Sequence, residues 1–388
     1  MALRAATPAT DLEAALQVAL GQLAANLERY TALFPDDTSV ANFYQPRRFE
    51  HHADGANTGW TTGFWTGMLW QAYELSGDLR FAASALRQLP SFAERLSRRI
   101  HIDHHDLGFL YTPSCVTAAR ICDDHEARQI ALAAADCLME RYLPHAGIIQ
   151  AWGDLDDPEQ RGRIIIDCLM NLPLLHWASG CTGHAHYRDA ARQHVLRSRE
   201  HLVRSDDSSY HTFHFDPVSG APLRGSTAQG LSDDSCWARG QAWGIYGFAL
   251  NHRYLPHMGL LQVAMRQADY FLRRLPANGI AYWDLAFGEG SPEPWDSSAS
   301  AIAVCGLLEL AGQLPEGAQR SRYQGAALHI LDGLVRHCAA RPGDSNALLL
   351  HGVYSKPHGQ GVDEANLWGD FFYLEALGRV ARGLRSYW

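Results

Sequence analysis

The chain has 388 residues, of which 47% are hydrophobic and 19% are charged, so it holds enough apolar material for a large core and is not a disordered protein. Its formal net charge is -9 at pH 7, and no run of Lys or Arg exceeds two residues. This charge pattern argues against nucleic acids and anionic membrane surfaces as partners.

The first predicted element is a helix near 10–33, where Thr10 and Glu13 form a capping-box pattern and leucines recur along one face. The residues before it lack the charged leader and apolar core of a signal peptide, and no apolar stretch is long enough to span a bilayer. Eight cysteines are scattered without a Cys-x-x-Cys pair. We therefore expect a cytoplasmic protein with reduced thiols and no membrane partner.

About twelve segments show helical periodicity, and almost no other pattern interrupts them. The eleven that follow the first lie near 59–76, 79–100, 107–121, 124–142, 167–180, 184–204, 232–255, 257–275, 295–313, 317–340 and 363–383. One hairpin is expected over 209–223, where Asp-Pro and Ser-Gly give turn signals. No Ser/Gly-rich linker divides the chain, so we expect a single domain over residues 1–388.

The helical segments alternate in character along the chain. The odd-numbered ones are amphipathic, whereas the even-numbered ones are apolar over more of their surface and rich in Gly, Ala, Ser and Trp. Helices that are apolar all round are buried helices. The alternation predicts an all-α double ring, with six inner helices inside six outer ones.

Each even-numbered segment opens with aromatic, acidic or amide residues. Antiparallel neighbours would bring all six of these openings to one mouth of the ring, where apolar faces and hydrogen-bonding groups suit a sugar. The competing interpretation is that the polar residues only cap the helices, which would be enough for a single helix. For six openings with Trp nearby we favour a ligand site. The six openings are 57–65, 103–109, 163–171, 232–243, 293–300 and 363–373.

Two His/Asp clusters, at 51–54 and 103–106, look like metal ligands at first sight. Zinc needs three or four ligands in a defined geometry, and adjacent residues rarely share one ion. Because the chain contains 20 histidines, such clusters also arise by chance. We therefore expect no metal, with one acid of the second cluster at the mouth.

Asp167 directly follows three isoleucines, an apolar setting that is costly for a carboxylate. Pro173 suits the first turn of a helix, so the helix should begin near Met170 or Asn171. A helix N-terminus favours the charged carboxylate, while apolar neighbours or a second acid raise its pKa. The sequence does not decide which of these opposing effects on the pKa of Asp167 is larger. We favour a catalytic role for Asp167 over a capping role.

Other candidate residues allow two interpretations each. Arg239, four residues before Trp243, either clamps a ligand carboxylate or stacks on an indole as a structural pair. His211 and His214 lie in the extended segment, where an exposed loop is the default interpretation. Residues 351–370 are interpreted as a mobile rim loop in which Lys356 meets an anionic group.

Five motifs together resemble the unsaturated glucuronyl hydrolases of glycoside hydrolase family 88, and they occur in the family's order over most of the chain. They are GFWTGMLWQAYELSGD, HHDLGFLYTPSC, IIIDCLMNLPLLHWAS, DDSCWARGQAWGIYGFAL and DEANLWGDFFYLEAL. The resemblance implies an (α/α)6 barrel, no cofactor, and a substrate with a Δ4,5-unsaturated uronic acid at the non-reducing end of a lyase-generated, glycosaminoglycan-type oligosaccharide. For the assembly we expect a monomer or a weak homodimer.

The resemblance also implies roles for individual residues. The catalytic acid/base falls on Asp167 and a second essential acid on Asp106. The substrate C4=C5 bond is an enol ether, so Asp167 would protonate C4 and then accept a proton from the water that adds at C5. Substrate contacts fall on Trp60, His105, Trp152, His211, Gln229, Trp237, Arg239 and Trp243.

The sequence departs from the family at two places. Ala228 stands where we expect a His before Gln229, which removes one substrate contact or moves it elsewhere. The late loop around Lys356 lacks the Ser-x-Ser-x-Lys pattern of members that prefer sulfated substrates, so a strong 6-sulfate preference is not expected.

Three alternative functions remain at this stage. An unsaturated rhamnogalacturonyl hydrolase would use the same barrel and chemistry on pectin fragments. A sugar epimerase-like isomerase would need a pair of catalytic histidines at the mouth, where this chain offers carboxylates. A sugar-binding protein without activity would keep the tryptophans but has no need for Asp167.

Overall fold

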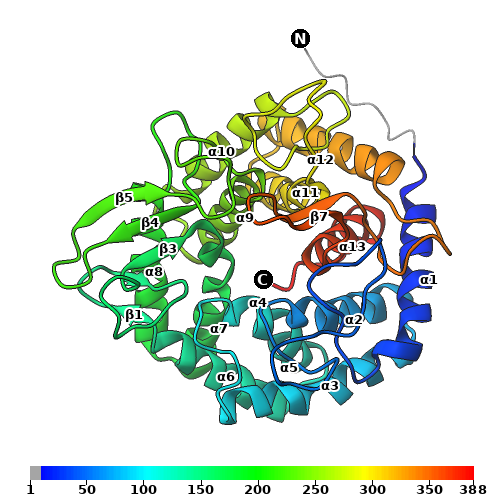
Figure 1. The fold of residues 1–388 in the computed structure, drawn as a ribbon, viewed down its shortest axis with the longest axis horizontal. Helices are drawn as coiled ribbons and strands as arrows, with labels where there is room; N and C mark the ends of the chain where they lie inside the picture. Colours follow the sequence, from blue (N-terminus) through cyan, green and yellow to red (C-terminus); the bar gives the residue numbers. More distant parts are fainter. Residues whose placement is uncertain (1–9) are drawn as a thin grey trace.

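The computed structural model describes residues 10–388, and its helices form two concentric rings (Figure 1). The outer ring consists of α1 (Leu12–Tyr30), α3 (Leu79–Ser97), α6 (His125–Met139), α8 (Ala185–His201), α10 (Leu260–Arg274) and α12 (Ala318–His337). The inner ring consists of α2 (Thr62–Ser76), α4 (Leu107–Tyr111) with α5 (Thr117–Ile121), α7 (Leu172–Thr182), α9 (Ala238–Tyr254), α11 (Ser297–Gln313) and α13 (Leu367–Arg382). The predicted all-α (α/α)6 double ring is confirmed.

The inner helices are buried nearly all round, as their composition predicted. Every residue of α2 from Thr62 to Ala72 is buried, and so is every residue of α9 from Ala238 to Asn251. Each inner helix contacts the next one, and α13 closes the ring on α2. Glycines permit this spacing, because a β-carbon at Gly63 or at Gly108 would clash with the backbone of the neighbouring segment.

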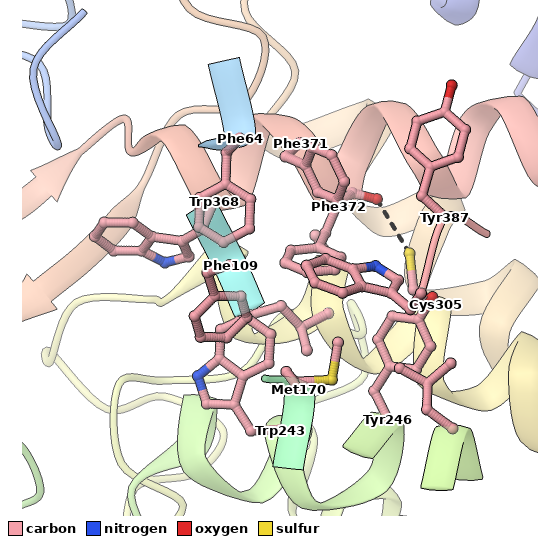
Figure 2. Packing of buried hydrophobic residues seen from close by; sticks show 14 of the residues in the cluster. Phe64, Phe109, Met170, Trp243, Tyr246, Cys305, Trp368, Phe371, Phe372 and Tyr387 are labelled. Atoms are coloured by element: carbon pink, nitrogen blue, oxygen red, sulfur yellow. Dashed lines mark hydrogen bonds between the residues drawn. The ribbon is translucent and has the colours of Figure 1, made fainter. Parts of the chain in front are cut away.

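Aromatic side chains fill the centre of the ring. Figure 2 shows Phe64, Phe109, Trp243 and Phe372 packed together, and all four are buried. The C-terminal residue Trp388 enters the same cluster and stacks on Phe372, with ring centroids 6.0 Å apart. The barrel is therefore a solid core, and open space for a ligand has to lie at one end of it.

Short strands lie between the helices. A three-stranded antiparallel sheet has the order β3 (Arg163–Ile165), β4 (Thr212–Phe215) and β5 (Pro222–Ser226). Two hairpins accompany it, β1 (Tyr142–Leu143) with β2 (Ile148–Ile149), and β6 (Gly352–Ser355) with β7 (Gln360–Glu364). The β4–β5 pair is the hairpin predicted for 209–223.

Several predicted boundaries were wrong. The helix expected over 107–121 is interrupted by a π-helical turn, Thr112–Val116, where Pro113 has no N–H to donate. The helix expected over 232–255 begins only at Ala238. The mobile rim loop expected over 351–370 is instead the β6–β7 hairpin, after which α13 begins at Leu367.

The chain around Asp167 is also more structured than predicted. Ile164 and Ile165 belong to β3, and Asp167 lies in a short 3-10 helix, Ile166–Met170. Helix α7 then begins at Leu172 with Pro173 in its first turn, close to the predicted start. Within residues 10–388, no helix is both long enough and apolar enough to cross a membrane.

Candidate active site

Two carboxylates from different inner-ring segments meet at one imidazole. Asp106 immediately precedes α4, and Asp167 lies in the 3-10 helix before α7. The Nε2 atom of His105 lies 3.3 Å from Oδ1 of Asp106 and 3.4 Å from Oδ1 of Asp167. The His105 side chain is 2% exposed, and the Asp106 and Asp167 side chains are 17% and 14% exposed. Both carboxyl groups are therefore largely shielded from solvent, but a small reactant can still reach them.

Neither acid caps a helix, which removes the competing interpretation for these two residues. Asp106 stands at the N-cap position of α4 without a side-chain capping bond, and the N-cap of α7 is Asn171. By contrast, Asp11, Asp78 and Asp124 each accept a backbone N–H at the start of an outer helix. Asp167 also keeps Oδ1 without a hydrogen-bond donor. Its carboxyl group is thus free to act on a ligand.

The surroundings drive the two acids to opposite protonation states. The pKa of Asp167 is raised to about 7, and burial is the largest cause. The positive charge of His105 lowers this pKa, whereas the negative charge of Asp106 raises it. Burial alone would raise the pKa of Asp106, but His105 and His104 outweigh it and lower that pKa. Asp106 in turn raises the pKa of His105 well above its usual value despite the burial of the ring. Near neutral pH the site holds an ionised Asp106, a protonated His105 and an Asp167 that is about half protonated.

These three residues are also the one group within residues 10–388 with the spacing to hold a metal ion, since their ligand atoms lie within 4.8 Å of one another. They supply three ligands, one fewer than a closed structural zinc site uses. The His105 nitrogen that would bind the ion is the atom that faces both carboxylates. An ion there would compete directly with the proton of His105.

Aromatic residues surround the acids at the mouth of the ring. Trp60, before α2, donates its indole N–H to the Tyr354 hydroxyl at 3.0 Å and stacks on Trp368, with ring centroids 5.0 Å apart. Trp152 carries the Arg163 guanidinium 5.0 Å from its ring centroid. Trp60 and Trp152 are partly exposed, so both present a face toward solvent.

Trp237 and His211 form a second wall, with ring centroids 4.9 Å apart. The default interpretation of His211 as an exposed loop residue was wrong: its side chain is 4% exposed, because the extended segment pairs with β3 as part of the sheet. Burial lowers the pKa of His211 to about 3, so the ring is neutral. Its Nδ1 pairs with the Thr212 hydroxyl at 2.6 Å, while Nε2 has no partner within the described chain.

Arg239 is held by several groups at once. Its guanidinium donates to Asp296 Oδ2 at 2.9 Å, to Gln229 Oε1 at 2.7 Å and to the Tyr354 carbonyl at 2.7 Å. It also lies between two indoles, 4.5 Å from the Trp237 centroid and 5.0 Å from that of Trp368. This geometry favours the structural cation–π interpretation and makes Arg239 the residue that ties Gln229, α11 and β6 together.

Trp243, one of the predicted substrate contacts, lies away from the ligand space. Trp243 is 1% exposed and packs against Phe109 and Phe372, so it supports the floor of the site from within the core (Figure 2). Ala228 is exposed and has only a methyl group where the family pattern suggested a His.

Sequence reasoning missed Asp296 and Tyr354 as individual residues. The predicted opening 293–300 includes Asp296. However, Asp296 pairs with Arg239, which lies 57 residues earlier in the chain, and no local pattern indicates this pairing. Tyr354 gave no local signal, because it belongs to a hairpin that was interpreted as a loop.

A comparison with protein-family models matches the chain to Glycosyl Hydrolase Family 88 over residues 37–377. The chain belongs to this family. A family 88 relative from Streptococcus pyogenes serotype M1, an unsaturated chondroitin disaccharide hydrolase, is 48% identical over 97% of this chain and 93% of its own length. The unsaturated glucuronyl hydrolase of Bacillus sp. (strain GL1) is 48% identical over 95% of this chain and 97% of its own length.

Solved structures of family 88 proteins agree with the fold. The unsaturated glucuronyl hydrolase from Bacillus sp. GL1, described as responsible for the degradation of glycosaminoglycan, superimposes with a TM-score of 0.92 at 47% identity, covering 97% of this chain and 99% of that one. The double ring is thus family 88 architecture.

Proposed function

We propose that this family 88 chain is an unsaturated glucuronyl hydrolase, which removes Δ4,5-unsaturated glucuronic acid from the non-reducing end of glycosaminoglycan-type oligosaccharides. One observation carries the proposal: Asp167 is a nearly dry carboxyl group with a pKa of about 7, placed beside the ionised Asp106 and a protonated His105. A neutral acid beside a negative charge suits a reaction that protonates a neutral double bond and develops positive charge.

The chemistry follows from the enol ether in this substrate. Asp167 donates its proton to C4, which leaves positive charge shared between C5 and the ring oxygen. Water attacks C5 and returns a proton to Asp167. The hemiketal formed in this way opens and expels the rest of the oligosaccharide. No glycosyl-enzyme forms, so the carboxylate-spacing rule of ordinary glycosidases does not apply.

The other residues have supporting roles in this proposal. Asp106 keeps His105 charged and stabilises the developing positive charge. Trp60, Trp152 and Trp237 offer indole faces to the sugar rings. The free nitrogen of His211 and the amide of Gln229 bond hydroxyl or carboxylate groups, and Arg239 and Trp243 position these residues from behind.

The activity has a direct optical test. The conjugated double bond of an unsaturated chondroitin disaccharide absorbs in the ultraviolet, and the enzyme should bleach this absorbance. In heavy water one deuterium should enter at C4. Asp167→Asn is isosteric, cannot donate the proton, and should abolish bleaching while keeping the melting temperature of the wild type. Full activity of this variant would rule out Asp167 as the proton donor.

The remaining expectations are proposals of the same kind. The chemistry above has no step that needs a metal or cofactor, and we propose a single catalytic domain that acts as a monomer or weak homodimer. We also propose a cytoplasmic location, supported by eight free cysteines, of which Cys115, Cys168 and Cys305 are buried without a partner sulfur.

A further inference from the structure

A second groove lies beside the site, between the β6–β7 hairpin and the loop that precedes α11. Its volume is about 420 Å³, within the range of small-molecule sites. Apolar surface comes from Tyr282, Pro294, Trp295 and Val362, and Lys356 lies at the hairpin turn. The Trp295 side chain is partly exposed. An indole face with a nearby cation is a suitable surface for an anionic sugar.

The groove and the candidate active site share two chain segments. Asp296, the residue after Trp295, pairs with Arg239 in the site, and its Oδ1 accepts the Val353 backbone N–H at 3.3 Å. Two residues before Lys356, Tyr354 accepts a hydrogen bond from Arg239 at its carbonyl and one from the Trp60 indole N–H at its hydroxyl. Figure 1 shows the hairpin crossing the ring beside α11 and α13. The groove and the site therefore share the β6–β7 hairpin and the segment before α11 as common walls.

The groove is lined by two acids, Glu293 and Asp363, and by one cation, Lys356, and they differ in whether they have partners within the chain. Asp363 Oδ1 pairs with His351 Nδ1 at 2.7 Å, and Glu293 Oε2 accepts the Trp283 indole N–H at 2.8 Å. The Lys356 ammonium makes no hydrogen bond or ion pair with the described residues 10–388. Lys356 is also the one lysine in the sequence. The two acids thus have hydrogen-bond partners within the chain, whereas the Lys356 ammonium has none among the described residues and is available to an anionic ligand.

We propose that this groove binds the third sugar of longer unsaturated oligosaccharides, a uronate, with Trp295 against the sugar face and Lys356 paired to its carboxylate. The inference rests on the proposed function, which places the first, unsaturated sugar at Asp167. In glycosaminoglycan-type chains uronates alternate with amino sugars, so the next carboxylate belongs to the third unit. The groove makes the enzyme selective for chain length and charge without taking part in the chemistry.

The test compares unsaturated hyaluronan disaccharide with the tetrasaccharide, because neither carries sulfate and only the tetrasaccharide has a third sugar. Trp295→Ala should lower kcat/KM for the tetrasaccharide about five- to tenfold, through KM, and change the disaccharide value less than twofold. Lys356→Gln should lower the tetrasaccharide value about threefold, and added salt should remove this difference. Lys356→Arg is the matched control and should behave as the wild type.

The outcomes separate the two proposals. If the wild type bleaches neither substrate, the proposed function fails, and the groove assignment fails with it. If the wild type bleaches both but neither variant changes the tetrasaccharide-to-disaccharide ratio, the groove assignment alone is overturned. If Trp295→Ala loses activity on both substrates through misfolding, the Lys356→Gln ratio and its salt dependence decide the question.

Discussion

The pH dependence of the reaction provides a demanding test of the environment of Asp167. Its pKa moves from the usual 3.8 to about 7. A shift of this size corresponds to roughly 4 kcal/mol in favour of the neutral acid. At its usual pKa only about 0.1% of Asp167 would hold a proton at pH 7, whereas with the raised pKa about half does. The structure therefore supplies a factor of several hundred in competent enzyme at neutral pH.

The sign of the effect follows from the role of the acid. The proton donor is present below the raised pKa and disappears as the pH rises through about 7, so kcat/KM should fall tenfold per pH unit above it. At pH 9 the loss should be about a hundredfold relative to the plateau. The lowered pKa of Asp106 means that this residue adds no loss of activity at mildly acidic pH.

The assay is the initial rate of bleaching of an unsaturated disaccharide at concentrations well below KM, from pH 4 to pH 9. Melting temperatures measured over the same range show whether the fold persists. The reasoning would be refuted if kcat/KM stayed constant up to pH 9, or if it already fell as the pH rose from 4 to 5. In either case burial would not control the proton on Asp167.

Three more predictions concern neighbouring groups. Asp106→Asn should lower kcat at least about a hundredfold with little change in KM, because His105 loses the charge that keeps it protonated; unchanged kcat in a folded variant would contradict this role. Arg239→Met should lower the free energy of unfolding by about 3–5 kcal/mol in chemical denaturation, because it leaves the buried Asp296 carboxylate without a cation. The double variant Arg239→Met/Asp296→Leu should recover much of that loss, and no recovery would argue against the ion pair as its cause. Dialysis against a chelator should leave the bleaching rate unchanged, and restoration of a lost rate by zinc would instead indicate a metal at His105 and the two acids.

The sequence predicted the double ring because its signal is local and repeated in every helix. Proline placed the start of α7 within a residue or two, since the missing N–H of Pro173 restricts it to a first turn. The same local reasoning failed for the isoleucines before Asp167. Three β-branched residues fit a strand or a helix, and the choice depends on pairing with β4, about fifty residues later in the chain.

The residues at the centre of the site could be proposed from the sequence, but their electrostatics could not. The motifs brought Asp106, His105 and Asp167 into consideration, while the pKa of Asp167 depends on how burial, a negative charge and a positive charge combine in space. Arg239 illustrates the same limit. Both of its interpretations were compatible with the sequence, and its contacts with Asp296 and Tyr354 come from segments more than fifty residues away.

The lysine on the β6–β7 turn has a practical consequence. Amine-reactive reagents modify lysine but leave arginine intact at neutral pH, so Lys356 is the one side-chain amine in this sequence that they can label. The label would be attached at the edge of the groove, two residues from the tyrosine that touches both Trp60 and Arg239. A dye attached there without mutagenesis, with labelling of the N-terminal α-amino group blocked or subtracted, would therefore report on what enters and leaves the mouth of the barrel.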